Sequence, residues 1–374
     1  MKHYYVGING TNVICNDNFF DGYITAYPLG EKNNICFMDK KTDSNKFDDL
    51  EFAKWIKTQI DNILKDYPDT CFTFFNKKME KICSFLSNKN IDSHNKWELT
   101  DFLNDKFKLR TYFKSKVPML DYIYKTGVEL NYSSLQETLK SDKFVLQSHT
   151  GAGGLTTHFI TNQDTLDHLN LEKETTYCIS TYQENLPINV TLMISDSEII
   201  LLPTSVQLIK NTGNFIYCGG DFLYPKRFKK EVSNNIEILS KIIGYEIQHM
   251  GYRGICGVDY IICSNGEIKF MELNPRYQGS SFLISLQLQQ FNSSIASINS
   301  DCFSKIRLTI PNIEVNSSFV NCENDMDFQE LGNPNRIIKK VENSTFRKIY
   351  HRSIIEDYDF EKPKNMNFIC NSIL

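Results

Sequence analysis

Several features that mark special classes of protein are absent from this sequence of 374 residues. Its 11 cysteines are scattered and form no C-x-x-C pair, which argues against a disulfide framework or a zinc site and predicts a reducing, cytoplasmic setting. No uninterrupted run of about eighteen apolar residues occurs, so a membrane span is not expected. The net charge of −4 gives no electrostatic reason to expect nucleic acid or an anionic membrane as a partner.

Signatures of several enzyme classes are missing as well. The glycine-rich segment from Thr150 to Thr157 is not followed by Gly-Lys-Ser/Thr, so it is no Walker motif. None of the seven histidines has a cysteine or serine in a triad-like context, and no H-x-x-x-H occurs, so nucleophilic and zinc hydrolases are not indicated. The glycines would let backbone N–H groups approach phosphates closely; the alternative is a surface turn.

The composition is that of a folded protein with more than one core. Hydrophobic residues make up 41% of the chain and charged residues 23%, and the length predicts two or three lobes. Residues 1–100 alternate strand-like and helix-like runs, which predicts a small α/β lobe with a parallel sheet. Residues 301–374 show no clear pattern of elements. That segment either covers a substrate site or builds a subunit contact, such as that of a homodimer.

The most informative segment runs from Gly257 to Arg276. Two β-rich runs flank Asn265-Gly266, a dipeptide typical of two-residue hairpin turns. If these two residues form the turn, Asp259 lies directly opposite Glu272, and Asn274 shares that face of its strand.

Opposed carboxylates in apolar strands need a compensating charge. Directly opposed residues have Cβ atoms about 5 Å apart, where like charges are destabilising. Either one acid holds a proton or a cation lies beside the pair. Oxygen ligands of this kind suit Mg²⁺, which commonly binds one or two carboxylates together with substrate phosphates. Asp259, Glu272 and Asn274 are therefore predicted to bind Mg²⁺; the alternative is a surface hairpin whose acids face water.

At these residues the sequence resembles the ATP-grasp superfamily, whose last core strands carry an acid and then Glu-x-Asn-x-Arg. Glu272-Leu-Asn274-Pro-Arg276 matches that pattern, and Gly257-Val-Asp259 matches the preceding strand. The resemblance implies that Asp259, Glu272 and Asn274 bind Mg²⁺, or Mn²⁺ in its place, bridging the phosphates of ATP. It also implies that Arg276 is catalytic and stabilises charge on the transferring phosphate or acyl phosphate.

The resemblance further implies the ATP-grasp fold, a combination of α/β and α+β parts. An N-terminal α/β lobe would span residues 1–100. Two α+β subdomains would follow at 101–185, with the phosphate loop, and at 186–300, with the metal site, and would clasp ATP between them. Residues 301–374 would form a C-terminal segment.

Other segments fall in the order that this family shows. Asp105-Lys106 resembles the family's Asp-Lys segment, which implies that Lys106 contacts an ATP phosphate and shares in catalysis. The glycine-rich segment resembles the flexible loop over the phosphates, and the residues after it resemble the hinge near the adenine. The nucleotide-binding residues implied in this way are Thr150, Gly151, Gly153, Gly154, Tyr182, Gln183, Glu184 and Asn189.

One position departs from the family pattern. The strand before the glycine loop often carries a second lysine near its end, where this chain has Gln147. An amide hydrogen-bonds a phosphate or adenine but carries no charge. Lys210 or His149 is then expected to meet part of the phosphate charge, although each also reads as an ordinary solvated or loop residue. A lysine introduced at Gln147 is expected to be tolerated and to tighten ATP binding.

The sequence therefore predicts an ATP-dependent ligase that activates a carboxylate as an acyl phosphate and couples it to an amine, releasing ADP and phosphate. The expected substrates are small-molecule or peptide carboxylates and amines, with the amine most plausibly that of an amino acid or peptide. Alternatives are an ATP-dependent carboxylase, a thioester-forming ligase, and an ATP-binding module without catalysis. The joint presence of Asp259, Glu272, Asn274 and Arg276 favours an active enzyme over the last of these.

Overall fold

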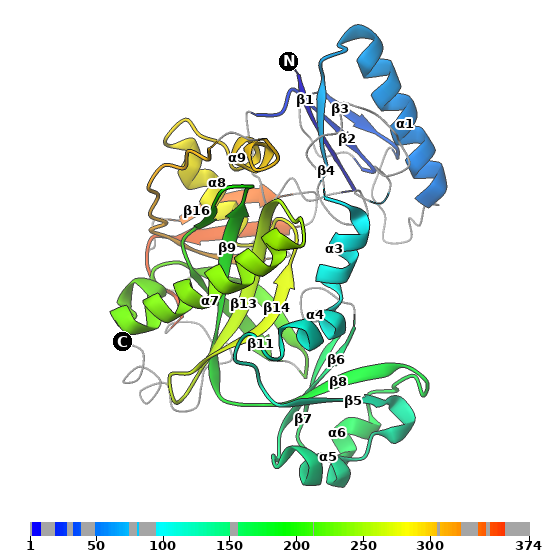
Figure 1. Ribbon diagram of the computed structural model, residues 1–374, viewed down its shortest axis with the longest axis vertical. Coiled ribbons are helices and arrows are strands. Elements are labelled where there is room, and N and C mark those ends of the chain that lie inside the picture. Colours follow the sequence, from blue (N-terminus) through cyan, green and yellow to red (C-terminus); the bar gives the residue numbers. More distant parts are fainter. Residues whose placement is uncertain are drawn as a thin grey trace.

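The computed structural model describes residues 2–8, 19–27, 33–38, 49–74, 81, 95–149, 156–211, 213–304, 307–322, 336–341 and 345–355. These residues form three β-sheets with helices packed on them (Figure 1). No helix in these ranges combines the length and the apolar character needed to cross a membrane.

The N-terminal lobe is a parallel four-stranded sheet in the order β3-β2-β1-β4. Its strands are β1 (His3–Gly7), β2 (Gly22–Thr25), β3 (Asn34–Cys36) and β4 (Cys71–Phe74). Helix α1 (Asp49–Asp66) buries Phe52, Ile56 and Ile60 against this sheet, because residues four apart share one helix face. The alternating α/β lobe with a parallel sheet is as the sequence predicts.

A small antiparallel sheet follows, in the order β5-β8-β6-β7 (Figure 1). Its strands are β5 (Tyr122–Thr126), β6 (Phe144–Ser148), β7 (Thr157–Ile160) and β8 (Thr176–Thr181), and its helices are α5 (Tyr132–Leu139) and α6 (Gln163–Asp167). Side chains alternate along β6. Phe144 and Leu146 belong to the core cluster with the two helices, whereas Val145 and Gln147 line a cavity on the other face.

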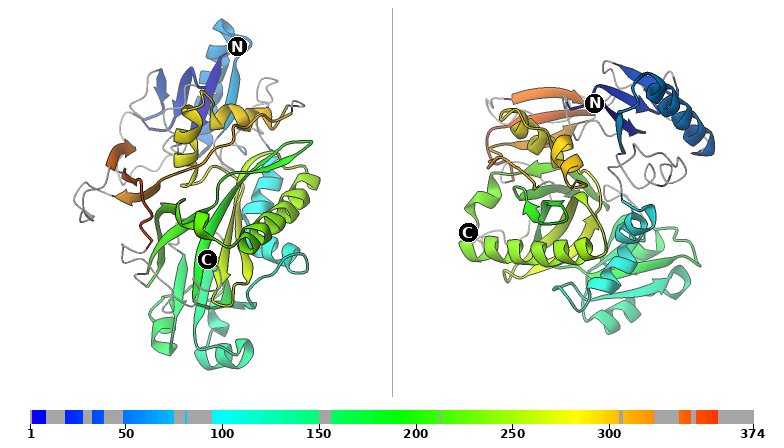
Figure 2. Two further views of the ribbon diagram at one scale, coloured as in Figure 1. Left: turned by 90° about the vertical axis from the view of Figure 1, so that its left-hand side faces the viewer. Right: turned by 45° about the horizontal axis from the view of Figure 1, so that its top comes forward.

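The central sheet has nine strands, with the path β14-β13-β9-β11-β12-β15-β17-β16 and with β10 paired to β9. Its strands are β9 (Asn185–Ile194), β10 (Ile199–Leu201), β11 (Ser205–Asn211), β12 (Phe215–Asp221), β13 (Gly254–Cys263), β14 (Ile268–Asn274), β15 (Ser318–Cys322), β16 (Arg336–Val341) and β17 (Thr345–Tyr350). Helix α7 (Lys230–His249) covers one face, and α8 (Ser281–Gln289) and α9 (Ile295–Asp301) cover the other (Figure 2).

Two short helices connect the N-terminal lobe to the rest. Helices α3 (Trp97–Asn104) and α4 (Lys106–Phe113) meet at Asp105, whose carboxylate caps α4 by accepting from the backbone N–H groups of Phe107 and Lys108. Leu109 and Phe113 of α4 pack into the core that α7 forms with the central sheet. The cap and this packing fix the start of α4, and with it Lys106, beside β14.

The C-terminal strands complete the central sheet. The sequence predicts no elements for residues 301–374, yet β15 pairs with β12, and β17 pairs with β15 and β16. Phe319, Val320, Ile349 and Tyr350 are buried in the two cores on either face of the sheet. This part of the chain is therefore integral to the central sheet.

Candidate active site

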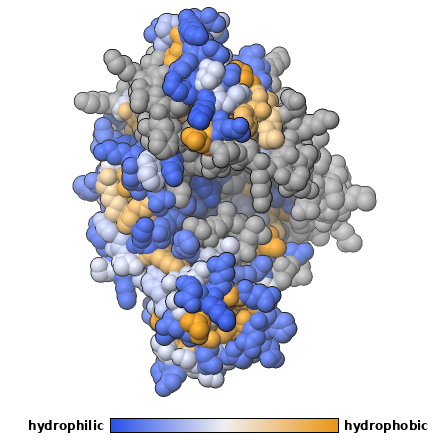
Figure 3. Space-filling model, turned by 90° about the vertical axis from the view of Figure 1, so that its right-hand side faces the viewer, coloured by the Kyte–Doolittle hydropathy of each residue, from blue (hydrophilic) through white to orange (hydrophobic). Residues whose placement is uncertain are grey.

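A cavity of about 430 Å³ lies between the small sheet and the central sheet, bordered by α4. A space-filling view shows a hollowed, mainly hydrophilic area above the small lobe (Figure 3). Most of the residues that the sequence singles out line this cavity: Lys106, Gln147, Tyr182, Gln183, Asn189, Asp259, Glu272, Asn274 and Arg276. Segments more than 160 residues apart in the sequence thus contribute to one site.

Three predicted residues among those described do not line the cavity. His149 is one of them, and it is exposed. Lys210 is exposed, because Gln207 and Ile209 on the same strand face the cavity and neighbouring side chains point to opposite faces. Glu184 is partly buried and is not among the lining residues. Thr150, Gly151, Gly153 and Gly154 lie outside the described residues.

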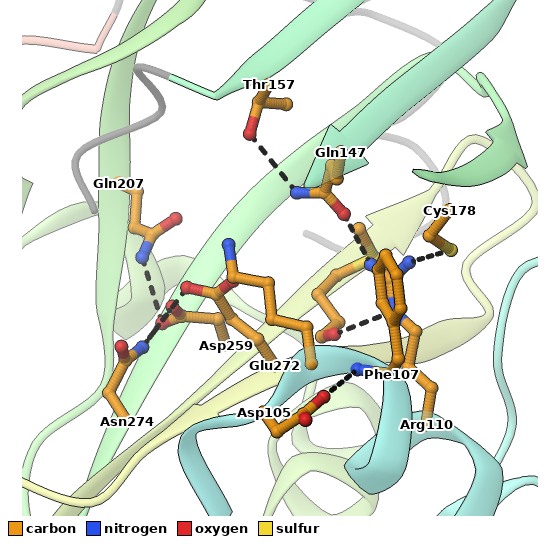
Figure 4. Close-up of polar contacts among 12 residues, drawn as sticks. Asp105, Phe107, Arg110, Gln147, Thr157, Cys178, Gln207, Asp259, Glu272 and Asn274 are labelled. Carbon is orange, nitrogen blue, oxygen red and sulfur yellow. Dashed lines mark hydrogen bonds and ion pairs between the residues drawn. The ribbon is translucent and has the colours of Figure 1, made fainter. Parts of the chain in front are cut away.

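The two acids of the hairpin face each other as the sequence predicts, with Asp259 on β13 paired to Glu272 on β14. Three side-chain amides hold Asp259, and Figure 4 shows those of Gln207 and Asn274. Its Oδ1 accepts from Asn189 Nδ2 at 2.6 Å and from Gln207 Nε2 at 2.9 Å, and its Oδ2 accepts from Asn274 Nδ2 at 3.0 Å. Asn189, which the sequence assigns to nucleotide binding, therefore positions a carboxylate.

Glu272 has a different environment. Its Oε2 lies 2.7 Å from the Lys106 ammonium, and its Oε1 accepts from Asn274 Nδ2 at 3.3 Å. Lys106 reaches it from the first turn of α4, which the Asp105 cap holds in place. Glu272 is thus paired with a cation, whereas the three donors to Asp259 are the neutral amides of Asn189, Gln207 and Asn274.

This difference shifts the pKa values of the two acids in opposite directions. Burial, followed by the neighbouring Glu272 charge, raises the pKa of Asp259. Burial also acts to raise the pKa of Glu272, but the Lys106 charge and its hydrogen bond outweigh it and lower the pKa. The pair has an anion anchored at Glu272 and a carboxyl group at Asp259 that ionises more readily when further positive charge arrives.

These residues suit a divalent cation of the Mg²⁺ type. Asp259, Glu272 and Asn274 offer only oxygen ligands once the Asn274 amide turns, since its Oδ1 here accepts from Arg276 at 3.2 Å. A cation beside the pair would relieve the repulsion between the two carboxylates. No group of three or more His, Cys, Asp or Glu side chains that suits a metal ion occurs in the described ranges, so the candidate set is two carboxylates and one amide.

Local sequence reasoning misses several cavity residues. Gln278 is buried and accepts from Asn189 Nδ2. It packs directly on Gly257, where a Cβ atom would lie only 1.5 Å from Gln278 Nε2. The glycine two residues before Asp259 is therefore needed for close approach. Arg110 is another missed residue, and its position four residues after Lys106, on the same helix face, is the signal that would have found it.

Aromatic rings border another part of the cavity. Tyr182 and Phe215 are nearly parallel, with an interplanar angle of 10° and centroids 6.1 Å apart, and both line the cavity. Phe159 on β7 contacts both rings, and its backbone N–H donates to Gly213 O across the gap between the two sheets. This end of the cavity offers flat apolar surfaces, while the acid pair and Lys106 make the other end polar.

The two facing sheets, with a polar cavity between them and an acid pair on β13 and β14 of the central sheet, define the ATP-grasp class of fold. The chain belongs to the ATP-grasp family: the family model for the ATP-grasp domain matches residues 94–280, half of the chain.

Individual relatives are distant. The [butirosin acyl-carrier protein]–L-glutamate ligase of Niallia circulans is 26% identical over 186 residues, which are 48% of this chain and 41% of that protein. The matched part thus spans less than half the length of that relative.

Solved structures match over nearly the whole chain. N5-carboxyaminoimidazole synthetase from Staphylococcus aureus, complexed with ADP, has a TM-score of 0.61 at 14% identity, covering 93% of each chain. Biotin carboxylase from Campylobacter jejuni has a TM-score of 0.65 at 12% identity, covering 93% of this chain and 87% of that one. At such identities the similarity shows the shared fold.

Proposed function

We propose that this protein is an ADP-forming ligase that phosphorylates a carboxylate at the expense of ATP and transfers the acyl group to an amine. The observation that carries this proposal is the meeting of Asp259, Glu272 and Asn274 with Lys106 and Arg276 in one cavity. Two carboxylates, an amide and two cations around one space support the proposal, because phosphoryl transfer requires metal ligands and positive charge around the phosphates.

Each of these residues has a proposed task. Lys106, which is paired with Glu272, and Arg276 balance the negative charge of the transferring phosphate. Asn189 and Gln207 hold the Asp259 carboxylate in its orientation through hydrogen bonds. A Mg²⁺ ion bound at Asp259, Glu272 and Asn274 would supply further charge neutralisation for the ATP phosphates. Tyr182 and Phe215 provide flat surfaces that suit the adenine ring.

The name of the Niallia circulans relative suggests which substrates to test. A glutamate ligase that acts on an acyl-carrier protein favours an amino acid such as glutamate among the carboxylates or amines to be tested. It also supports a second candidate, in which the acyl group goes to a carrier protein and a thioester is formed. We propose that both reactions begin with the same acyl phosphate.

The deciding experiment measures ADP and phosphate release with Mg²⁺-ATP. Pools of amino acids, dipeptides and small carboxylic acids are supplied, with and without a pantetheinylated acyl-carrier protein, and products are identified by mass spectrometry. We expect ADP release that depends on one acid–amine pair, with a product lighter than the pair by one water.

Other results would lead to other conclusions. ADP release that requires the carrier protein, with a mass gain on that protein, would establish the second candidate. Release that requires bicarbonate would indicate a carboxylase. Nucleotide binding with no turnover in any pool would argue for a binding module, and absence of nucleotide binding would overturn the proposal.

A further inference from the structure

Arg110 is a buried cation with neutral hydrogen-bond partners only. It lies on α4 and is 4% exposed. Its guanidinium donates to Gln147 Oε1 at 2.7 Å, to Cys178 Sγ at 2.8 Å and to Met271 O at 3.4 Å (Figure 4). The Cys178 thiol is neutral as well, since burial raises its pKa despite the adjacent guanidinium. In the part of the chain that the structure describes, no carboxylate forms an ion pair with Arg110.

A buried charge of this kind needs an opposite charge to offset its desolvation. Lys106, one helical turn earlier, has Glu272 as its partner at 2.7 Å, so its charge is already compensated. Arg110 lines the same cavity, and none of its three direct contacts carries a negative charge. The charge of Arg110 also helps to lower the pKa of Glu272, but that carboxylate is shared with Lys106, which holds it in an ion pair. An anionic ligand in the cavity would balance the positive charge of Arg110.

Gln147 fixes the direction of the guanidinium. Its Oε1 accepts from Arg110, and its Nε2 donates to Thr157 Oγ1 at 3.2 Å. Exchanging the amide oxygen and nitrogen would place an NH₂ group against the guanidinium, so the two contacts determine the orientation together. Gln147 is itself buried and borders the cavity, and it extends from β6 toward α4.

We infer that Arg110 contacts the phosphates of the nucleotide and that Gln147 is its positioning residue. The inference rests on the proposed function, because the anion is the ATP that the ligase would consume. A lysine at Gln147 would provide a positive charge here. In this chain Arg110 on the neighbouring helix α4 provides that charge instead. A planar guanidinium presents several N–H donors in a fixed arrangement, which suits phosphate oxygens.

The contact with Arg110 also changes an expectation drawn from the sequence. A lysine at Gln147 is no longer expected to be tolerated by itself. It would remove the acceptor for Arg110 and place two cations side by side, which is unfavourable in a buried site. The same lysine is expected to be accommodated when Arg110 is replaced by a neutral residue of similar length.

The test is calorimetric binding of ADP and of adenosine to the full chain. For Arg110→Met we expect the Kd for ADP to rise by about 10- to 100-fold, while the Kd for adenosine stays within about twofold of wild type. The double variant R110M/Q147K, which moves the charge across the contact, is expected to regain most of the ADP affinity. Lys108→Met, an exposed change on the same helix, serves as the matched control and is expected to leave both constants unchanged.

The outcomes separate the inference from the proposed function. If wild type binds ADP and Arg110→Met binds it equally well, the inference is wrong and the proposed function stands. If Arg110→Met weakens ADP and adenosine alike, or if R110M/Q147K shows no recovery, Arg110 has a structural role and the inference is wrong. Should Arg110→Met fail to fold, the test uses Arg110→Lys, which keeps the positive charge. If this variant prefers ADP over adenosine as strongly as wild type does, the inference is supported. If that preference is lost, the inference is wrong. A wild-type protein that binds no nucleotide would overturn both.

Discussion

At the scale of single residues, the two acids of the pair differ in pKa because their surroundings differ. Asp259 and Glu272 are cross-strand neighbours, yet three amides surround one and Lys106 pairs with the other. Their pKa values shift in opposite directions as a result. Glu272 is the acid of the pair that ionises more readily, and its ion pair holds Lys106 at the cavity wall.

Replacing Glu272 by Gln removes that charge at nearly constant volume. We expect ATP-dependent turnover to fall by about 100-fold or more, because a proposed metal ligand and the partner of Lys106 are lost together. The fold is expected to persist, since the side chain borders a cavity instead of filling the core. Product formation by mass spectrometry and thermal unfolding measure the two effects.

The matched control for this variant is Glu267→Gln in the same hairpin. Glu267 is exposed at the turn, where it pairs with Lys269 at 3.1 Å, and it does not line the cavity. Its replacement is expected to leave turnover unchanged. Near-normal activity of Glu272→Gln would contradict the proposed metal site.

At the scale of elements, the hairpin is predicted correctly at the site and wrongly at the turn. The sequence indicates a two-residue turn at Asn265-Gly266, but Cys263 pairs with Glu267 around a three-residue loop that ends in Gly266 at φ +83°. The pairing is therefore shifted by one residue near the turn. A β-bulge between Asp259 and Tyr260 restores the expected register.

The bulge could not be predicted from the sequence because tertiary contacts accompany it. Phe270, beside the bulge, donates its backbone N–H to Pro118 O, and Met119 forms a bridge with Phe270. That contact joins segments about 150 residues apart, so no local pattern shows it. Motif spacing was enough to find the acids, whereas Arg110, which no motif marks, reaches the cavity because distant elements pack together.

A hydrogen bond from α4 and an ion pair from the turn after it connect this segment to α7 and give a pH-dependent prediction. Glu246 on α7 accepts from Lys116 Nζ at 2.8 Å and from Tyr112 OH at 2.7 Å. The hydrogen bonds from Lys116 and then Tyr112 lower the pKa of Glu246 below its ordinary value of 4.5. A carboxyl group with a lowered folded-state pKa stabilises the protein above its unfolded-state pKa, and the contribution is lost as pH falls through the folded-state pKa.

Glu246→Gln is therefore expected to lower the Tm by about 1–3 °C at pH 7. The difference from wild type should shrink below about pH 4.5 and vanish at lower pH, where the wild-type carboxyl is protonated too. Thermal unfolding between pH 3 and pH 8 measures it. Glu237→Gln, which breaks a pair with Lys241 within α7 alone, is the control and should have the smaller effect. A constant difference across this pH range would rule out the ion pair as its cause.

At the scale of the whole molecule, the central sheet extends well beyond the matched ATP-grasp domain, which ends at residue 280. Strand β15 pairs with β12 about 100 residues earlier in the chain, a contact that no periodicity reveals, and so the sequence gives no elements there. Asn321 on β15 also lines the cavity. The C-terminal strands thus belong to the central sheet and, through Asn321, also contribute to the wall of the cavity.

Buried Asp221 at the end of β12 joins the C-terminal segment to the sheet through hydrogen bonds. Its Oδ1 accepts from the N–H groups of Leu223 and Tyr224, and its Oδ2 accepts from Ser353 Oγ and Ile354 N, each at 2.8–3.0 Å. Without the C-terminal segment, half of these donors would be lost and a buried carboxylate left under-satisfied. The open edge of β12 would also be exposed.

A chain that ends after Asp301 is therefore expected to fail to fold, although it retains the whole matched ATP-grasp domain. It lacks Phe319, Val320 and Tyr350, which are buried in the cores on the two faces of the sheet, and loss of large core side chains costs about 3–5 kcal/mol each. Circular dichroism during thermal unfolding and size-exclusion chromatography compare it with the full chain. Ser353→Ala in the full chain is the milder companion variant: it removes one donor to Asp221 and should lower the Tm by only a few degrees, about what the loss of one hydrogen bond costs. A cooperative transition in the shortened chain, at the Tm of the full protein, would show instead that the C-terminal strands are an appendage and that the half of the sheet with the acid pair is stable without them.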